Sequence, residues 1–267
     1  MNDVIEVKGH FVASLDILEY GSKIGKYSPQ ELREFLEKVN KLIDVTKHTL
    51  QTINSNVINS NFDVKIKMFS DNIFLYTESN WFNLLIAVCF LQVNFVLSNI
   101  FIRGALSYGD LYANDDYISG KGLVQSYELE NKIAIFPRVI ISAEFLEATK
   151  QLSNVSIFNK NESRSTGDIH VLNHEDFEDI KSFFYEEDFD GWTYVSYLDF
   201  WQYYIKQSGE TEDVYPIKDI LKYHKENVSS NLSSSEQNKT VLQKYRWSKK
   251  YHNEFCKKHC FGDFELY

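Results

Sequence analysis

The first 150 residues alternate between short apolar runs typical of strands and longer amphipathic runs typical of helices. We expect strands at about 9–18, on both sides of a tight Ser-Asp-Asn turn at 70–72, at 100–112 and at 138–142. A helix should begin at Ser28-Pro29, and further helices are expected at about 81–98 and 122–131. The run 81–98 is apolar on most sides, which predicts a core helix.

The resulting order, β-α-β-β-α-β-α-β, predicts an α+β fold in which helices cover an antiparallel-rich sheet, as in ferredoxin-like or palm domains. We expect residues 1–150 to form this domain and residues 151–267 to form a C-terminal α/β extension packed on it. In the extension, the sequence predicts a hairpin turn at 188–192 and helices at 217–227 and 236–258. A Ser/Asn-rich loop near 228–235 should separate these two helices.

Composition and charge narrow the class of protein. A hydrophobic content of 43% in 267 residues is ample for a core, and a net charge of −10 argues against a general binder of DNA, RNA or anionic membranes. The N-terminal residues lack the basic and apolar regions of a signal peptide, and the apolar run at 81–97 contains Asn83, Gln92 and Asn94. With three cysteines, these features favour a cytoplasmic protein without a membrane span.

Two aspartates at expected strand ends form the first candidate site. Asp16 lies near the end of the first strand, and Asp71 lies in the predicted hairpin turn. Mg²⁺ prefers oxygen ligands and is commonly held by one or two carboxylates together with substrate phosphates. The alternative is that both are ordinary turn residues, because aspartate is common in turns.

Four segments in this order resemble the catalytic domain of class III nucleotide cyclases, over about residues 9–143. They are Asp16-Ile17, the Lys-Ile-Lys-Met-Phe-Ser-Asp run at 65–71, the Arg-Gly-Ala-Leu-Ser-Tyr-Gly-Asp run at 103–110 and the Gly-Lys-Gly-Leu-Val-Gln-Ser-Tyr-Glu-Leu-Glu run at 120–130. The resemblance implies that Asp16, Asp71 and the Ile17 carbonyl hold two Mg²⁺ or Mn²⁺ ions. It places Lys67 where the family selects the base, and it implies a nucleoside triphosphate substrate and a homodimer.

The sequence departs from the family pattern in the last segment. There the family carries an asparagine for the ribose and an arginine for the reacting phosphate, and these places hold Val124 and Glu128. Neither side chain can donate a hydrogen bond to a phosphate oxygen. Lys121, Arg103 and Arg138 are the candidates to replace the arginine as the catalytic cation. Arg103 could instead pair with an acid such as Asp110 or Glu130.

Three functions remain open. The first is a divergent cyclase that converts a triphosphate to a cyclic nucleotide with release of pyrophosphate. The others are a non-catalytic nucleotide-binding or assembly module and a nucleotidyltransferase that makes a short oligonucleotide. Similar bacterial proteins act in antiviral defence, which the resemblance makes a plausible setting. A zinc site at His252, Cys256, His259 and Cys260 has possible spacings, but no CxxC pair supports it.

Overall fold

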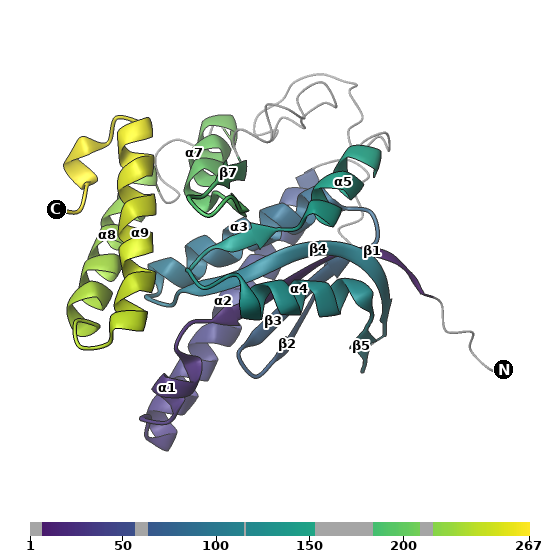
Figure 1. The fold of residues 1–267 in the computed structure, drawn as a ribbon, viewed down its shortest axis with the longest axis horizontal. Helices are drawn as coiled ribbons and strands as arrows, with labels where there is room; N and C mark the ends of the chain where they lie inside the picture. The colour runs from purple at the N-terminus through teal and green to yellow at the C-terminus, as the bar shows by residue number, and fades with distance from the viewer. Residues whose placement is uncertain (1–6, 57–63, 115, 153–183, 209–215) are drawn as a thin grey trace.

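The computed structural model describes residues 7–56, 64–114, 116–152, 184–208 and 216–267 (Figure 1). Its centre is an eight-stranded sheet with the order β2-β3-β1-β4-β6-β8-β7, and β5 pairs with β4. β4 and β6 run parallel, and the other pairs are antiparallel. The strands are β1 (Lys8–Ile17), β2 (Lys65–Phe69), β3 (Asn72–Thr77), β4 (Ile102–Ala113), β5 (Ile118–Ser119), β6 (Val139–Ile141), β7 (Tyr185–Glu187) and β8 (Thr193–Val195). The predicted antiparallel-rich α+β fold is confirmed.

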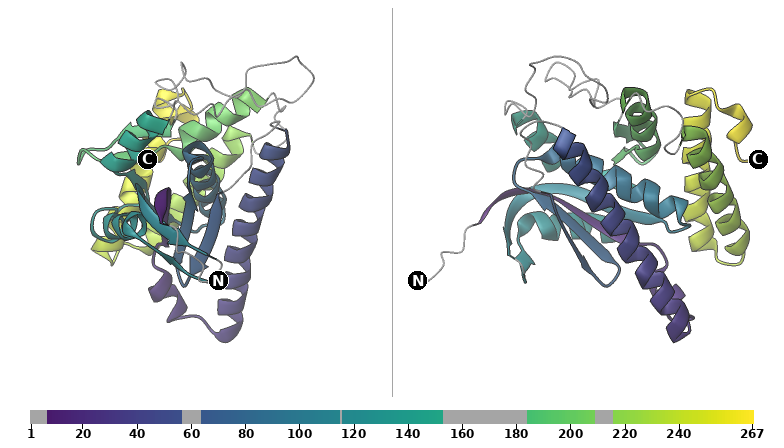
Figure 2. Two further views of the ribbon diagram at one scale, coloured as in Figure 1. Left: turned by 90° about the vertical axis from the view of Figure 1, so that its right-hand side faces the viewer. Right: turned by 180° about the vertical axis from the view of Figure 1, so that it is seen from behind.

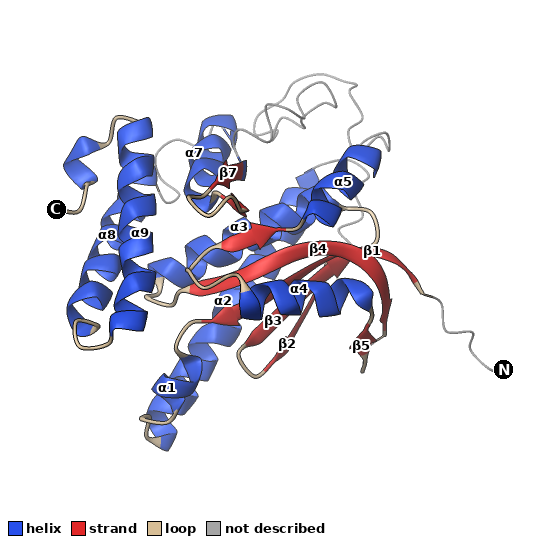
Figure 3. Cartoon of the chain, in the orientation of Figure 1, coloured by secondary structure: helices blue, strands red, loops and turns tan. Residues whose placement is uncertain are grey.

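Helices cover both faces of the sheet (Figures 1 and 2). Helix α4 lies on one face, and α2 and α3 lie on the other, while the α8–α9 pair stands at the end of the sheet where β1 ends (Figure 3). The helices are α1 (Tyr20–Ile24), α2 (Pro29–Asn56), α3 (Trp81–Leu97), α4 (Lys121–Lys132), α5 (Ala143–Leu152), α7 (Tyr197–Ser208), α8 (Ile217–Ser234) and α9 (Lys239–Lys258).

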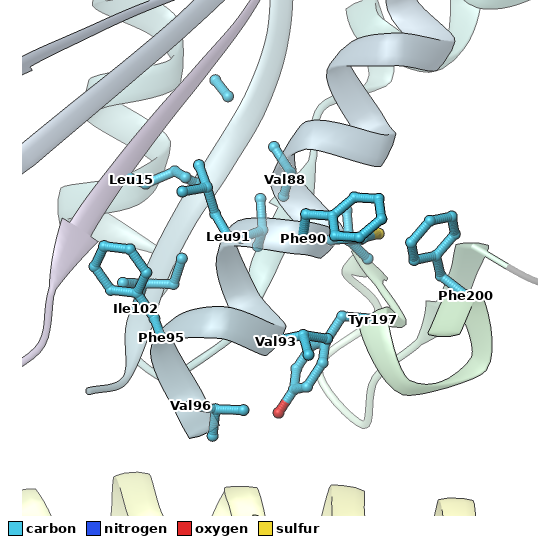
Figure 4. Close-up of a cluster of buried hydrophobic side chains, with 14 of the residues drawn as sticks. Leu15, Val88, Phe90, Leu91, Val93, Phe95, Val96, Ile102, Tyr197 and Phe200 are labelled. Atoms are coloured by element: carbon cyan, nitrogen blue, oxygen red, sulfur yellow. The ribbon is translucent and has the colours of Figure 1, made fainter. Parts of the chain in front are cut away.

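Helix α3 is buried on nearly all sides, as its apolar sequence predicts. Figure 4 shows Leu15 and Ile102 of the sheet on one side of α3, and Tyr197 and Phe200 of α7 on the other. The C-terminal segment therefore shares the core of the sheet. No helix among the described residues is long and apolar enough to cross a membrane.

The alternation of β1 decides which side chains reach which face. Phe11, Ala13 and Leu15 belong to the main core, because successive strand residues point to opposite faces. Ser14 and Asp16 therefore lie on the face that α4 covers. These three side chains fix β1 against the main core, and Asp16, the last polar residue of β1, lies on the opposite face of the sheet.

Of two helix boundaries predicted from the sequence, one is confirmed and the other is wrong. The start of α2 is confirmed, since the Ser28 hydroxyl and amide both donate to the Glu31 carboxylate at 2.8 and 2.7 Å. The end of the first C-terminal helix was wrongly placed, because α8 continues through the expected loop to Ser234. There the Ser233 hydroxyl donates to the Ser229 carbonyl at 3.1 Å, so these polar side chains bond to the preceding turn and leave the helix intact.

The C-terminal segment joins the sheet through β8, which pairs with β6. The predicted turn at 188–192 is confirmed: the Gly191 amide donates to the Asp188 carbonyl at 2.9 Å, and Gly191 has a φ of 80° that suits glycine. Helices α1, α5 and α7 were not expected from the sequence. The domain boundary near residue 150 stays a prediction.

Candidate functional site

Asp16 and Asp71 lie side by side at one end of the sheet. Asp16 pairs with Asn72 across the β1–β3 ladder, and the Ile17 amide donates to the Asp71 carbonyl at 3.2 Å. Ser70 takes the left-handed conformation with a φ of 58°. This tight turn between β2 and β3 brings the Asp71 carboxyl group close enough for its charge to raise the pKa of Asp16.

Arg103 is the direct neighbour of Asp16 on β4. Its Nε donates to Asp16 Oδ2 at 2.8 Å, and its Nη2 lies 3.0 Å from Glu130 Oε1. Its Nη1 donates to the carbonyls of Glu130 and Ala134 at 3.4 and 3.2 Å. Four of the five guanidinium N–H groups are therefore used by the protein itself.

Glu130 reaches this arginine because of a stripe of small residues on α4. Gly122, Ser126 and Glu130 are the buried residues of this helix, at the four-residue spacing of one helix face. The Ser107 hydroxyl donates to the Gly122 carbonyl at 2.6 Å, and a Cβ on Gly122 would lie only 3.0 Å from the Gly109 carbonyl oxygen. Glycine lets the helix approach β4 closely, which carries Glu130 to the end of β1.

The electrostatics of the site follow from burial and from this crowding of acids. Burial raises the pKa of Asp16, the Arg103 hydrogen bond and charge oppose that rise, and the neighbouring Asp71 adds to it. Burial also raises the pKa of Glu130 to about 7, and Arg103 opposes this rise. Arg103 therefore offsets only part of the negative charge collected here. The remaining charge favours an added cation.

The donor set fits a hard divalent cation. Two adjacent carboxylates and the Ile17 carbonyl are oxygen ligands of the kind Mg²⁺ and Mn²⁺ take. No group of three or more His, Cys, Asp or Glu side chains within the described ranges is placed to hold a metal ion alone. An ion at Asp16 and Asp71 would have to complete its coordination with phosphate oxygens and water, as Mg²⁺ commonly does.

Lys67 lies on the same face of the sheet as Asp16. It pairs with Phe74, which in turn pairs with Ser14, two residues before Asp16. Its Nζ donates to the Asn114 carbonyl at the end of β4. The position is compatible with the base contact that the resemblance implies, which stays a prediction.

The other two candidate cations are placed away from the aspartates. Lys121 is in the first turn of α4 and Glu130 in the last, so about 13 Å of helix separates them. Arg138 is fully buried, and its guanidinium group pairs with Asp188 and Asp190 of the C-terminal segment. Within one chain, Arg103 is the sequence candidate that the fold brings to Asp16.

His252, Cys256 and His259 near the C-terminus contact other groups of the protein. His252 and Cys256 are buried with Cys256 Sγ 3.5 Å from His252 Nε2, and the latter nitrogen also lies 2.9 Å from the Phe264 carbonyl. His259 instead contacts Asp199 at 2.6 Å. These partners leave the two histidines pointing to different groups.

No family model and no curated protein matches the chain. Among solved structures, it is similar to the catalytic core of a rhodopsin-guanylyl cyclase with converted specificity in complex with ATPαS, at 14% identity and a TM-score of 0.43 over 54% of this chain and 84% of that chain. It is also similar to an adenylate/guanylate cyclase/hydrolase from Silicibacter pomeroyi, at 16% identity and a TM-score of 0.41 over 63% of this chain and 93% of that one.

A third similar structure is the guanylate cyclase domain from Catenaria anguillulae in complex with GTP, at 14% identity and a TM-score of 0.40 over 54% of this chain and 84% of that chain. All three are nucleotide cyclases, the class that the sequence resembles. The likeness is partial and concerns the fold alone. What this chain does must be argued from its own side chains.

Proposed function

We propose that this protein is a divergent nucleotide cyclase, which converts a nucleoside triphosphate to a cyclic nucleotide and pyrophosphate. The observation that supports this most is the pairing of Asp16 and Asp71 at one end of the sheet, where Arg103 offsets their charge only in part. When bound, two Mg²⁺ or Mn²⁺ ions at these carboxylates and the Ile17 carbonyl would neutralise phosphate oxygens and lower the pKa of the ribose 3′-hydroxyl.

The protein's own groups would prepare the site for this chemistry. The Arg103 guanidinium fixes the orientation of the Asp16 carboxylate through its Nε–H, and Glu130 fixes the guanidinium in turn. Because Arg103 has one N–H left to give, its role in the proposal is to position Asp16. Lys67 would contact the base from the open part of the same face, and a second copy of the chain would close that face as a homodimer.

A second function, a non-catalytic nucleotide-binding module, is favoured by one specific observation. Glu128 stands where the family has its phosphate-binding arginine, and it pairs with Lys132 at 3.3 Å on the exposed side of α4. The helix that carries the reacting arginine in cyclases therefore offers no cation there. Binding without turnover would be the expected behaviour of such a module.

The test is incubation with each of the four nucleoside triphosphates and Mg²⁺ or Mn²⁺, followed by mass analysis. A cyclase yields a cyclic monophosphate, a nucleotidyltransferase yields an oligonucleotide, and a binding module yields neither while still binding triphosphate. Asp71→Asn should abolish the product. Asp110→Asn, the same change at an exposed position of β4, should leave it unchanged. Equal activity of Asp71→Asn and wild type would refute the proposal.

A further inference from the structure

Helix α9 of the C-terminal segment is fixed against the segment that follows Asp16. The Tyr245 hydroxyl donates to Glu19 Oε2 at 2.9 Å, and the Tyr245 ring packs edge-on against Phe101 with centroids 5.2 Å apart. The Phe101 carbonyl accepts a hydrogen bond from the Leu18 amide at 2.9 Å. The helix is thus anchored two and three residues beyond Asp16, from a part of the chain more than two hundred residues away.

Lys244 directly precedes Tyr245, so this anchor places it near the segment that follows Asp16. It lies next to Tyr245 and on the face of α9 that also holds the buried Trp247, Ser248 and Tyr251, three, four and seven residues further on. Lys244 is half-buried. Burial lowers the pKa of its ammonium group and Arg103 lowers it further, while Glu19 and Asp16 act in the opposite direction. Arg103, Glu19 and Asp16 are therefore near enough for their charges to act on Lys244.

The ammonium group of Lys244 has no counter-charge in contact with it. No carboxylate of the described residues lies within 4.0 Å, the limit for an ion pair, although Glu19 and Asp16 are near enough to affect its pKa. Burying half of an ammonium group without a counter-charge costs free energy, and the N–H groups of such a side chain can donate to an anion. A phosphate beside the two aspartates would supply that anion.

We propose that Lys244 binds the triphosphate at the Asp16–Asp71 pair and is the cation that takes the place of the arginine missing from α4. The inference rests on the proposed function. Among the described residues of one chain, Arg103 has most of its donors used, Arg138 is paired with two aspartates, and Lys121 is at the far end of α4. Lys244 joins no such network.

In the reaction, the ribose 3′-oxygen attacks the α-phosphorus and releases its proton to water. The bond from that phosphorus to the bridging oxygen breaks, and pyrophosphate leaves with the electron pair. The ammonium group of Lys244 donates hydrogen bonds to the phosphate oxygens throughout and gives up no proton. A fixed nearby cation stabilises the negative charge that moves toward the leaving group. This is the stabilisation that the arginine missing from α4 would supply.

The test compares Lys244→Met with Lys244→Arg and with Arg246→Met, a matched loss of positive charge on the exposed side of α9. Product formation should fall by roughly 10²–10³ in Lys244→Met, be partly restored in Lys244→Arg, and be unchanged in Arg246→Met. The second measurement is the rise in melting temperature on adding inorganic tripolyphosphate with Mg²⁺. This rise should be lost in Lys244→Met and retained in the control.

The melting temperature of the free protein separates phosphate binding from a structural role. Removing an uncompensated half-buried charge should leave it unchanged or raise it, whereas a lysine needed to hold α9 would lower it. If the wild type converts a triphosphate and Lys244→Met does so equally well or better, the inference about Lys244 is wrong and the cyclase proposal stands. If the wild type only binds triphosphate, the cyclase proposal fails, and equal binding by Lys244→Met refutes the inference about Lys244 as well. If the wild type neither binds nor converts any triphosphate, the proposed function fails and this inference fails with it.

Discussion

Replacing Arg103 by methionine tests the candidate site most directly, because it removes the positive charge between Asp16 and Glu130 while keeping a side chain of similar length. The side chains of Arg103, Asp16 and Glu130 are 17%, 15% and 3% exposed, so both ion pairs are largely shielded from water. Breaking a buried pair by removing one partner typically costs ~3–5 kcal/mol. We expect about 3 kcal/mol here, because Asp16 keeps some contact with water and Glu130 can take up a proton.

For a chain of this size, a loss of that magnitude should lower the melting temperature on the order of 6–12 °C. The second expectation concerns Mg²⁺. In the variant, Asp16 and Asp71 lose their competing cation, so Mg²⁺ at ten times its dissociation constant should restore about 1.4 kcal/mol. The wild type should gain less, because Arg103 already occupies one oxygen of Asp16.

The assay is urea unfolding followed by tryptophan fluorescence, with MgCl₂ titrated against NaCl at equal ionic strength. Arg246→Met is the control for the loss of one exposed positive charge. A loss below about 1 kcal/mol for Arg103→Met would mean that the ion pairs contribute little. Equal stabilisation of variant and wild type by Mg²⁺ would mean that the ion does not bind at Asp16 and Asp71.

Three further predictions concern the scaffold. Gly122→Ala should reduce stability by about 1–3 kcal/mol in urea unfolding, because its Cβ would meet the Gly109 backbone at 3.0 Å; a change below 0.5 kcal/mol would contradict the close approach of α4. Burial lowers the pKa of His252 below its unfolded value of about 6.5, so the stability that the neutral ring contributes is lost as the pH falls below that value. His252→Gln should reduce the slope of unfolding free energy against pH between 5 and 6.5 by up to ~1.4 kcal/mol per pH unit, and an unchanged slope would refute this. Trp247→Phe removes the indole N–H that donates to the buried Asp188 carboxylate at 2.5 Å, and it should lower the free energy of unfolding measured by calorimetry by about 1–3 kcal/mol. An unchanged free energy of unfolding would mean that water replaces the lost donor.

The sequence was most informative where one local signal decided the structure. The alternation of β1 predicted that strand, and the capping residues predicted the start of α2, to within about one residue. The uniformly apolar run of α3 predicted a buried helix, and burial on both sides of it is what Figure 4 shows. The Ser70-Asp71 turn predicted the hairpin, although a serine there has to adopt a left-handed φ.

The sequence was less informative where the outcome depends on distant contacts. Nothing local shows that the Ser/Asn-rich run after Asn227 is helical; the Asn227 amide donates to the Val96 carbonyl at 2.7 Å, and that contact comes from α3. The expected pairing of Arg103 with an acid such as Glu130 is confirmed, but the burial of Glu130 follows from the packing of α4 and was not predicted. The spacing of Gly122, Ser126 and Glu130 was the available signal, because small residues four apart allow close contact with a sheet.

The position of β8 also bears on how the chain is made. When residues up to 152 have left the ribosome, β6 has β4 on one side and an open edge on the other, because β8 lies at 193–195. Arg138 is then without Asp188 and Asp190, which neutralise it in the finished sheet. We expect the sheet of the nascent chain to keep an unpaired β6 edge and an uncompensated Arg138 charge until some forty more residues have been added. Synthesis that pauses in this interval should therefore leave the protein most exposed to chaperones, to proteases and to pairing with neighbouring chains.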